Sequence, residues 1–557
     1  MKIKNILLVK LGLFSLVMMM VSGCSLFDLD INEDPNNPAT ASSNLLLTNI
    51  EIGIMTNLAA NEGDAETFMG LMGTQALSRY NLNNNSYTGF WDDMYIGPLK
   101  DLEGLIAASA ESPHFLGVAQ TLKAIGYATM VDCFGDIPFS EASAGDALTK
   151  NINPKFDKDA DIYAACIKLL DDAIANFAKG SPVPVTGDLI YNGNIANWTK
   201  AAKTIKLKLL MTARKGIANS TAAISTLIAA GGFITATGDD FLFRYSKDPT
   251  SIRHPWYTGA YTGGEFDYTY LCHELMIESL VDEDPRWPFY FRRQTKSILD
   301  SNDPTQFNTQ PCSGGQPCIY GYVVNNQNVI NRIYIDKGKP YGAAEKDFLA
   351  GVFGRDRGDG DGLPSDGAFR TLPGVYPAGG YYDVAAPAVP GANAAQGAGI
   401  YPFLTAVNTS YYLIEAMLEL GVAGDPRAEF EKAIRNHITR VINFGIANDV
   451  NSVRPSDASV TAYVDLWLGR YDAAVNNTAK LNVVMKQLWF SSYGNGFEIY
   501  NAYRRLGLPT NIQDHVEGTV RGFPLRLPYP QSELTLNPNA AAYKTVAFDN
   551  APIFWDK

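Results

Sequence analysis

Apolar residues recur at helical spacing along most of the chain. The most regular stretch is 160–178, where apolar side chains fall at i, i+4, i+7, i+8, i+11 and i+15 on one helix face. Comparable patterns predict helices over 43–60, 63–80, 90–109, 117–134, 197–216, 409–421, 427–443, 457–474, 481–489 and 497–507. The stretch from Gly117 is apolar on nearly all sides, which is typical of a central helix. The pattern therefore predicts a helical protein, with Asn197 expected to cap the helix that carries Trp198.

Between about 240 and 405 the helical pattern is intermittent. Aromatic residues, Gly and Pro dominate this part, and 351–400 alone holds twelve Gly and five Pro. Loops of this length inside a folded protein are usually functional or disordered. We therefore predict an all-α core, built from 40–240 and 405–510, that carries a loop-rich insert over 240–405.

The N-terminus has the features of an export signal. Lys2 and Lys4 precede an apolar run of eleven residues, which is too short to span a bilayer. Val21-Ser22-Gly23-Cys24 then matches a lipobox, in which Cys24 receives the lipid. These patterns predict a signal peptide over 1–23, a lipidated tether over 24–39 and a single domain over 40–557.

The overall charge excludes one class of partner. The formal net charge is −13, and no basic stripe is present that could neutralise phosphates, so nucleic-acid binding is not expected.

Short motifs in three distant parts of the chain resemble one family. Near the C-terminus they are Trp489, the segment Tyr503-Arg504-Arg505-Leu506-Gly507-Leu508-Pro509, and the segment Pro524-Leu525-Arg526-Leu527-Pro528-Tyr529-Pro530 followed by Glu533. In the first half, a helix closes on Phe134-Gly135-Asp136-Ile137-Pro138. Near the start stands Asp34-Pro35-Asn36-Asn37-Pro38. Together they resemble the SusD/RagB-like nutrient-binding outer-membrane lipoproteins.

The resemblance implies a fold, a location and a partner. Its fold would be a tetratricopeptide-like helical-repeat core, although no 34-residue repeat is evident in the sequence. The protein would be attached to the outer membrane through its lipid anchor and would face the cell surface. There it would pass a glycan or peptide to a SusC-like TonB-dependent transporter. A surface glycoside hydrolase and a scaffold lipoprotein without small-ligand binding are the alternatives.

Catalytic and cofactor motifs are scarce. His273-Glu274 begins like a zinc-protease helix, but position 277 is Ile and the second histidine is missing. Gly358 to Gly362 lacks the flanking strand and helix of a dinucleotide site. We therefore expect a binding protein and not an enzyme, with no cofactor. A weaker candidate is a structural calcium ion at Asp359, Asp361 and Asp366, whose spacing misses the EF-hand pattern.

Two aromatic clusters are candidate ligand sites. One comprises Tyr80, Asn83 and Tyr87 in an Asn-rich segment, and the other comprises Trp256, Tyr257 and Tyr261 in a segment with Gly and Pro. Aromatic faces can stack on sugar rings and Asn can bond to hydroxyls, but the same residues could equally pack beneath loops.

Five cysteines follow Cys24. Cys312 and Cys318 flank a Gly-containing spacer, and export favours a disulfide between them. Cys133, Cys166 and Cys272 are expected to be buried small hydrophobes.

Overall fold

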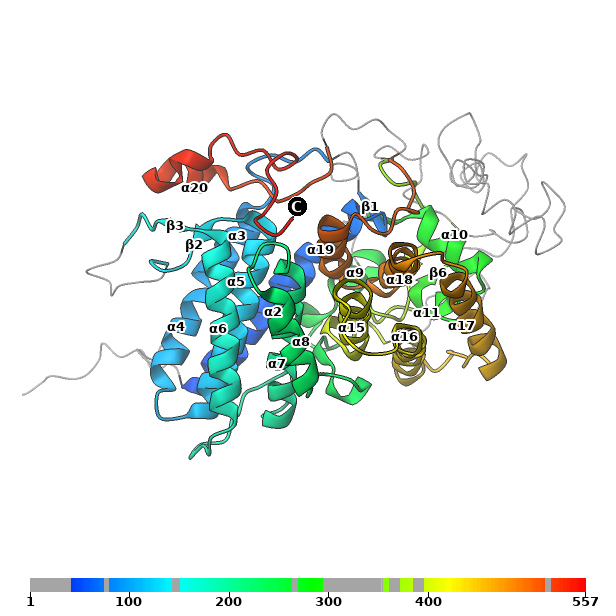
Figure 1. The fold of residues 1–557 in the computed structure, drawn as a ribbon, viewed down its shortest axis with the longest axis horizontal. Helices are drawn as coiled ribbons and strands as arrows, with labels where there is room; N and C mark the ends of the chain where they lie inside the picture. Colours follow the sequence, from blue (N-terminus) through cyan, green and yellow to red (C-terminus); the bar gives the residue numbers. More distant parts are fainter. Residues whose placement is uncertain are drawn as a thin grey trace, which may run out of the picture.

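The computed structural model of the protein describes residues 42–74, 80–142, 151–262, 269–293, 352, 354–359, 371–383, 395–515 and 522–556. Two groups of helices stand side by side, with α19 (Gly496–Leu506) between them (Figure 1). The strands among the described residues are short and form two-stranded antiparallel pairs. The predicted all-α fold class is confirmed.

The first group of helices comes from the N-terminal half. It comprises α2 (Ser43–Phe68), α3 (Thr88–Ile96), α4 (Pro98–Ala108), α5 (Pro113–Phe134), α6 (Asp159–Phe177), α7 (Ile195–Ala213) and α8 (Ser220–Ala230). Successive members pack against one another, and α5 lies between α4 and α6. Because α5 is covered from several sides, it is the central helix that its all-round apolar pattern predicts.

Three helix boundaries in this group differ from the prediction. The first helix runs without a break through Gly63 to Phe68, so the helix predicted over 63–80 is wrong. The helix predicted over 90–109 is divided at Gly97, after which Pro98 begins α4. The cap of α7 is Asn194, whose side chain accepts from the Asn197 amide, so the cap predicted at Asn197 is three residues too late.

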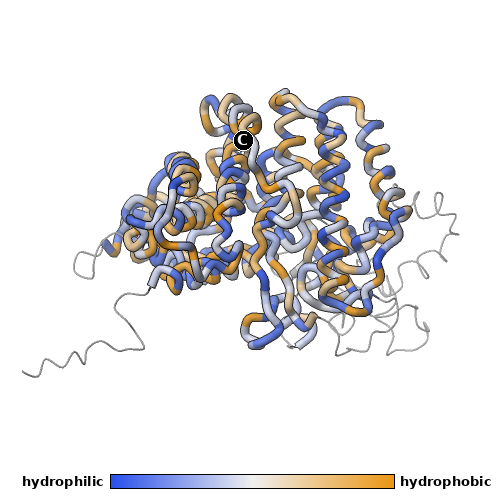
Figure 2. The backbone as a smooth tube through the Cα atoms, turned by 90° about the horizontal axis from the view of Figure 1, so that it is seen from below, coloured by the Kyte–Doolittle hydropathy of each residue, from blue (hydrophilic) through white to orange (hydrophobic). Residues whose placement is uncertain are grey.

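The second group comes from the C-terminal half. It comprises α15 (Ala406–Leu420), α16 (Pro426–Asn448), α17 (Asp457–Asp472) and α18 (Asn477–Ser491). The helix α19 ends at Gly507 with φ 68°, as the predicted Gly stop requires. This helix also packs on α2 and α7, and it thereby joins the two groups. Hydrophobic and hydrophilic residues are interspersed along the helices (Figure 2), and the buried hydrophobic residues of both groups belong to one core cluster.

The predicted insert begins and ends at one pair of strands. In this pair, β4 (Phe241–Arg244) lies antiparallel to β8 (Ile400–Leu404), so that Phe241 faces Leu404 and Arg244 faces Ile400. The two ends of the insert are therefore neighbours where they leave the helical groups.

Short elements form the described part of the insert. They are α9 (Pro255–Tyr257), the π-helical turn η5 (Thr258–Thr262), β5 (Thr269–Leu271), α10 (His273–Val281), α11 (Trp287–Tyr290), β6 (Phe291–Arg292) and β7 (Leu372–Pro373). The remaining strand partners are β1 (Met72–Thr74), which pairs with β5, and the pair of β2 (Ile137–Pro138) with β3 (Phe156–Asp157). Two single 3₁₀ turns, η3 (Thr237–Asp239) and η4 (Thr250–Ile252), flank β4.

A buried arginine connects the insert to the second group of helices. Arg286, which precedes α11, is fully buried and forms an ion pair with Asp284. Its guanidinium also reaches His437 on α16 and Tyr463 on α17. One side chain therefore bonds to three parts of the fold.

The C-terminal segment returns to the first group and brings two of the family-like motifs together. The Leu527 amide donates to the Cys133 carbonyl at 2.6 Å, and the Tyr529 hydroxyl donates to the Asp136 carbonyl at 2.7 Å. Beyond it, α20 (Gln531–Leu536) and η11 (Pro538–Tyr543) lie beside β3 (Figure 1). These motifs are therefore packing elements of one structural unit.

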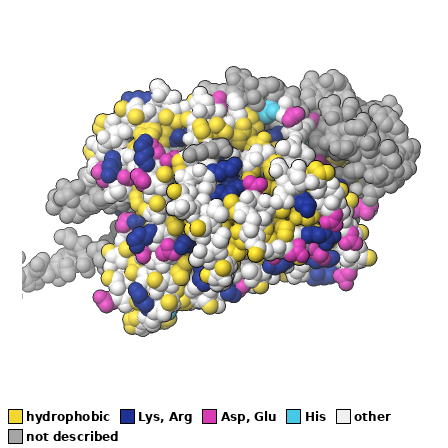
Figure 3. Space-filling view, viewed as in Figure 1, with side chains coloured by type: hydrophobic (Ala, Val, Ile, Leu, Met, Phe, Trp, Pro, Cys, Tyr) yellow, Lys and Arg dark blue, Asp and Glu magenta, His cyan; other side chains and the backbone are white. Residues whose placement is uncertain are grey.

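No helix among the described residues combines the length and the apolar character that a membrane crossing requires. On the face shown in Figure 3, basic and acidic side chains are interspersed. Cys133, Cys166 and Cys272 are free thiols in the interior, as predicted.

Candidate functional site

The predicted site at Tyr80, Asn83 and Tyr87 is corrected by the structure. Tyr80 is 4% exposed and Tyr87 is 2% exposed, so neither ring offers a free face for stacking. Only Asn83 is exposed, and its side-chain oxygen accepts from the Asn85 amide within a turn. The loop is docked because the Asn84 side chain donates to the Tyr529 carbonyl at 2.7 Å. Asn84 and Tyr529 are far apart in the sequence, so local composition could not reveal this contact.

The second predicted cluster divides into packing and surface residues. Trp256 is 6% exposed and its ring packs against Tyr493 and His254, so it is also corrected to a packing residue. The Nδ1 atom of His254 accepts from the Trp256 amide, and burial lowers the pKa of this histidine to about 3. A neutral imidazole is therefore part of the support beneath the cluster. Tyr257 is 5% exposed and is likewise corrected to a packing residue, whereas Tyr261 is half-buried.

Tyr257 and Tyr261 belong to a row of stacked side chains, which we call the aromatic–arginine cluster: Arg253, Tyr257, Tyr261, Tyr381 and Arg292. The guanidinium of Arg253 lies 5.9 Å from the Tyr257 ring centroid. Tyr257 stacks on Tyr261 at 5.0 Å with an interplanar angle of 22°. Tyr261 meets the Tyr381 ring edge-on at 4.8 Å, and Arg292 lies 4.7 Å from the Tyr381 centroid. Cations over aromatic faces and ring pairs of this geometry are favourable contacts.

Backbone elements hold the row in place. The Tyr261 hydroxyl donates to the Pro373 carbonyl at 2.8 Å, next to the pairing of β6 with β7. Gly397 adopts φ 87°, and a Cβ there would come within 2.8 Å of the Tyr257 ring. A glycine is therefore required for the chain to pass this close to the stack. The π-helical turn η5 sets Tyr261 over Tyr257, and such turns are frequent at functional sites.

A second arginine–aromatic pair adjoins the cluster. Arg293 lies 4.7 Å from the centroid of the half-buried Trp287 ring, and its Nε donates to Asp383 at 2.9 Å. Asp383 is two residues from Tyr381, so this pair continues the cluster along one chain segment.

Sequence reasoning missed Trp287, Arg292, Arg293 and Tyr381. A usable signal was present, because aromatic residues stand directly before charged ones in the runs 287–293 and 381–383. The two runs are far apart in sequence. The pairing of β6 with β7 and the bond of Arg293 to Asp383 bring them together.

The predicted metal and covalent sites lie largely outside the described residues. These comprise Cys24, the candidate disulfide of Cys312 with Cys318, and the candidate calcium ligands Asp361 and Asp366. Asp359 is described and is 4% exposed. In the part of the chain that the structure describes, no group of three or more His, Cys, Asp or Glu side chains is placed to hold a metal ion. The calcium site and the disulfide stay predictions.

One arrangement resembles a nucleophilic triad in residue types only. Cys272, His273 and Asp356 lie together, and His273 Nδ1 is 2.9 Å from the Asp356 carboxylate. The other ring nitrogen of His273 accepts from the Gly354 amide, while the Cys272 thiol donates to the Met72 carbonyl. Burial raises the pKa of this thiol well above its ordinary value, so a thiolate is disfavoured. These contacts hold the insert against β1, and they do not activate Cys272 as a nucleophile.

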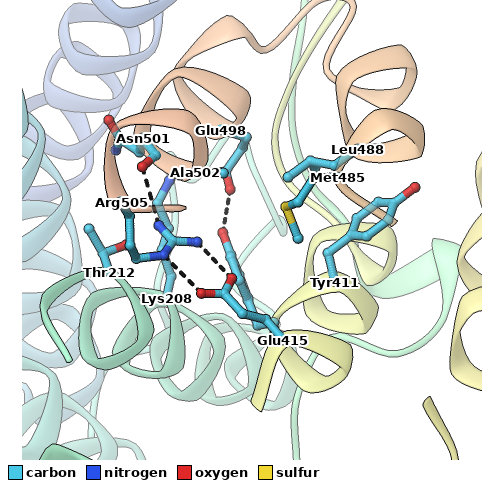
Figure 4. Close-up of a pocket in the computed structure, with 11 residues that line it drawn as sticks. Lys208, Thr212, Tyr411, Glu415, Met485, Leu488, Glu498, Asn501, Ala502 and Arg505 are labelled. Carbon is cyan, nitrogen blue, oxygen red and sulfur yellow. Dashed lines mark hydrogen bonds and ion pairs between the residues drawn. The ribbon is translucent and has the colours of Figure 1, made fainter. Parts of the chain in front are cut away.

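A small polar cavity lies where α7, α15, α18 and α19 meet (Figure 4). Arg505 forms a two-point ion pair with Glu415 at 2.9 and 2.8 Å, and Arg214 reaches the same carboxylate at 2.6 Å. Burial alone would raise the pKa of Glu415, but Arg505 and Arg214 outweigh it and hold that pKa below its ordinary value. The cavity volume of about 10 Å³ is the space of one water molecule, so no sugar fits, and the cavity is structural.

Comparison with known proteins identifies the family. The model of the SusD-like family, described as starch-binding and associating with the outer membrane, matches residues 35–333, which is more than half of the chain. The chain belongs to the SusD-like family. The resemblance inferred from the motifs is thereby confirmed. No curated protein matches this SusD-like chain.

Solved structures resemble this SusD-like protein over nearly its whole length. A SusD/RagB family protein from Bacteroides thetaiotaomicron is 20% identical with a TM-score of 0.64, covering 93% of this chain and 99% of the other. A SusD homologue from Bacteroides fragilis is 17% identical with a TM-score of 0.67, covering 93% and 100%. A chitin-binding SusD homologue from Flavobacterium johnsoniae is 16% identical with a TM-score of 0.62, covering 92% and 98%. At these identities the likeness concerns the fold, and it confirms the SusD-like, tetratricopeptide-like core.

Proposed function

We propose that this SusD-like protein captures a glycan at the aromatic–arginine cluster and delivers it to a SusC-like TonB-dependent transporter. The observation that carries the proposal is the row of rings and guanidinium groups whose members Arg253, Tyr261 and Tyr381 are only half-buried. Rings contact the C–H faces of sugars and guanidinium groups donate to oxygen atoms. The starch-binding description of the family and the chitin-binding solved relative support a glycan over an oligopeptide.

The protein binds its glycan without cleaving it. The Cys272, His273 and Asp356 group is engaged in packing, which supports this part of the proposal. A glycoside hydrolase, the alternative, would release new reducing ends from a polysaccharide that the purified protein binds. A scaffold lipoprotein, the other alternative, would copurify with a transporter barrel and would bind no polysaccharide.

Tyr381→Ala is expected to weaken binding of a polysaccharide that the wild-type protein retains in a native gel. The expected loss is about 1–3 kcal/mol, the effect of losing one large contact at a binding surface. Isothermal titration with soluble fragments of that polysaccharide measures the change. Tyr543→Ala is the matched control, since Tyr543 is also half-buried and stacks on an aromatic ring, Phe156, at 4.6 Å. Equal affinities of the two variants would refute the site, provided that both melt as the wild type does.

The membrane attachment in this proposal is a lipid on Cys24, with residues 40–557 as one domain facing the cell surface. The lipobox Val21-Ser22-Gly23-Cys24 motivates a direct test. Cys24→Ala is expected to abolish incorporation of a fatty-acid analogue and to move the protein out of the outer-membrane fraction. Label that persists on the Cys24→Ala protein would contradict the anchor.

A further inference from the structure

Two arginines beside the rings share one arrangement. Arg253 lies over Tyr257, and its Nε donates to the Lys247 carbonyl at 2.8 Å. Arg293 lies over Trp287, and its Nε donates to Asp383 at 2.9 Å. In both, an aromatic face and an Nε bond fix the plane of the guanidinium.

The hydrogen bonds and the ion pair of these two guanidinium groups are made by their Nε atoms. Among the described residues, no hydrogen-bond or ion-pair partner is recorded for their terminal nitrogens. Both side chains are half-buried, so those nitrogens lie at the rim of the cluster. A guanidinium held in one plane presents parallel N–H donors, which match the two oxygens of a carboxylate or sulfate group. The arrangement is therefore preorganised for an anionic group and less suited to a single hydroxyl.

The surrounding charges favour the same ligand. The segment 244–253 carries Arg244, Lys247 and Arg253 against the single acid Asp248. Next to Tyr381, Arg292 lies over the ring and Arg293 pairs with Asp383. The whole chain has a net charge of −13, so this local basic excess runs against the average of the molecule. A basic surface on an acidic protein raises the local concentration of anionic ligands.

We propose that the ligand of the aromatic–arginine cluster is an anionic glycan, whose carboxylate or sulfate groups bind Arg253 and Arg293 while its sugar rings contact the neighbouring aromatic side chains. The inference rests on the proposed function, because it names the substrate class of the same site. A polysaccharide fits better than an acidic peptide, since the half-buried rings of Trp287, Tyr261 and Tyr381 lie beside the arginines and can contact a sugar. The arginines also stand at two places along the cluster, where a repeating charged polymer can reach both.

The test compares polysaccharides that share a backbone and differ in charge. The probes are polygalacturonate against its methyl-esterified form, and κ-carrageenan against agarose, with amylose as a neutral glucan and poly-glutamate as an acidic peptide. Retention of the wild-type protein in native gels containing each probe ranks the affinities. We expect a charged member to be bound at least tenfold more tightly than its neutral counterpart, with the preference falling as NaCl is raised.

Each other result has a defined meaning. Equal or better binding of the neutral members, amylose included, overturns the anionic class and leaves the glycan-binding function standing. Preferential binding of poly-glutamate overturns the glycan in favour of a peptide. Binding of no probe at all counts against both the inference and the proposed function.

Variants assign the effect to the two arginines. Arg253→Gln and Arg293→Gln are each expected to lower affinity for the charged probe at least tenfold, which is a larger factor than the loss expected for its neutral counterpart. Arg253→Lys keeps the charge but lacks the planar fork, so it should recover only part of the loss. Arg435→Gln is the control, because Arg435 is an arginine on α16 that is 39% exposed at its side chain and paired with Glu431. Since Arg293→Gln leaves the buried Asp383 without its cation, Arg253→Gln decides the outcome if the other variant fails to fold. Unchanged affinity of folded Arg253→Gln overturns the inference.

Discussion

Arg286→Ala is expected to lower the free energy of unfolding by about 3–5 kcal/mol, because it removes one partner of a fully buried ion pair. Both Arg286 and Asp284 have 0% exposed side chains. Arg286 donates to the two oxygens of Asp284 at 2.9 and 2.7 Å, to His437 Nδ1 at 2.9 Å and to Tyr463 at 2.7 Å. Burial and the positive charge of Arg286 lower the pKa of His437 well below its ordinary value, so the neutral imidazole can accept this bond. Without the guanidinium, the carboxylate of Asp284 stays buried and uncompensated.

Urea denaturation of wild type and variant measures the change. The matched control is Arg427→Ala, since Arg427 bonds to both oxygens of Asp472 at 2.7 Å but its side chain is 46% exposed. A solvent-exposed ion pair contributes little to stability, so the control should lose much less stability than Arg286→Ala. If both variants lost a similarly small part of the free energy of unfolding, Arg286 would not be what holds the insert to the helices.

A second large effect is expected in the pH dependence of stability, at Glu62. This glutamate on α2 is 1% exposed, and neither of its carboxyl oxygens meets the geometry of a hydrogen bond to a described residue. Burial and the neighbouring Glu66 raise its pKa well above the ordinary value, although the nearby Gly496 amide opposes the shift. Burial likewise raises the pKa of Glu66, which accepts from the Gly494 amide at 2.6 Å.

The direction of the effect follows from proton linkage. The native state binds a proton that the unfolded chain, with a glutamate pKa of about 4.3, has already released. The stability from these carboxyl groups is therefore fully present below the unfolded pKa and is lost as pH rises through the raised native pKa. Each unit of the shift corresponds to about 1.4 kcal/mol, so the loss is expected to be large.

Glu62→Gln is expected to flatten the decline of stability above pH 4.3, because glutamine resembles the protonated glutamate and cannot ionise. Denaturant titrations at several pH values compare the slopes of wild type and variant. Glu431→Gln is the control, because the side chain of Glu431 on α16 is 36% exposed, and it should keep the slope of the wild type. An unchanged slope in Glu62→Gln would show that Glu62 does not ionise in this range.

Local sequence determined the helices and several of their ends. The stretch 160–178 has an uninterrupted apolar face and forms α6, while Gly507 ends α19 because it adopts a left-handed φ. The central place of α5 was also readable, since its apolar residues leave no face for water. Capping was less certain, because Asn194 and Asn197 both precede Trp198 and only the hydrogen bond between them selects Asn194.

Tertiary contacts decided which aromatic residues are available to a ligand. Tyr80, Tyr87, Trp256 and Tyr261 look alike in sequence, but the partners that bury the first three come from distant segments, such as Phe523 for Tyr80 and Tyr493 for Trp256. The same holds for the cluster itself, which exists because β6 pairs with β7 and carries Tyr381 to Tyr261. Periodicity reports the faces of one helix, whereas the exposure of a loop residue depends on what the rest of the chain places over it.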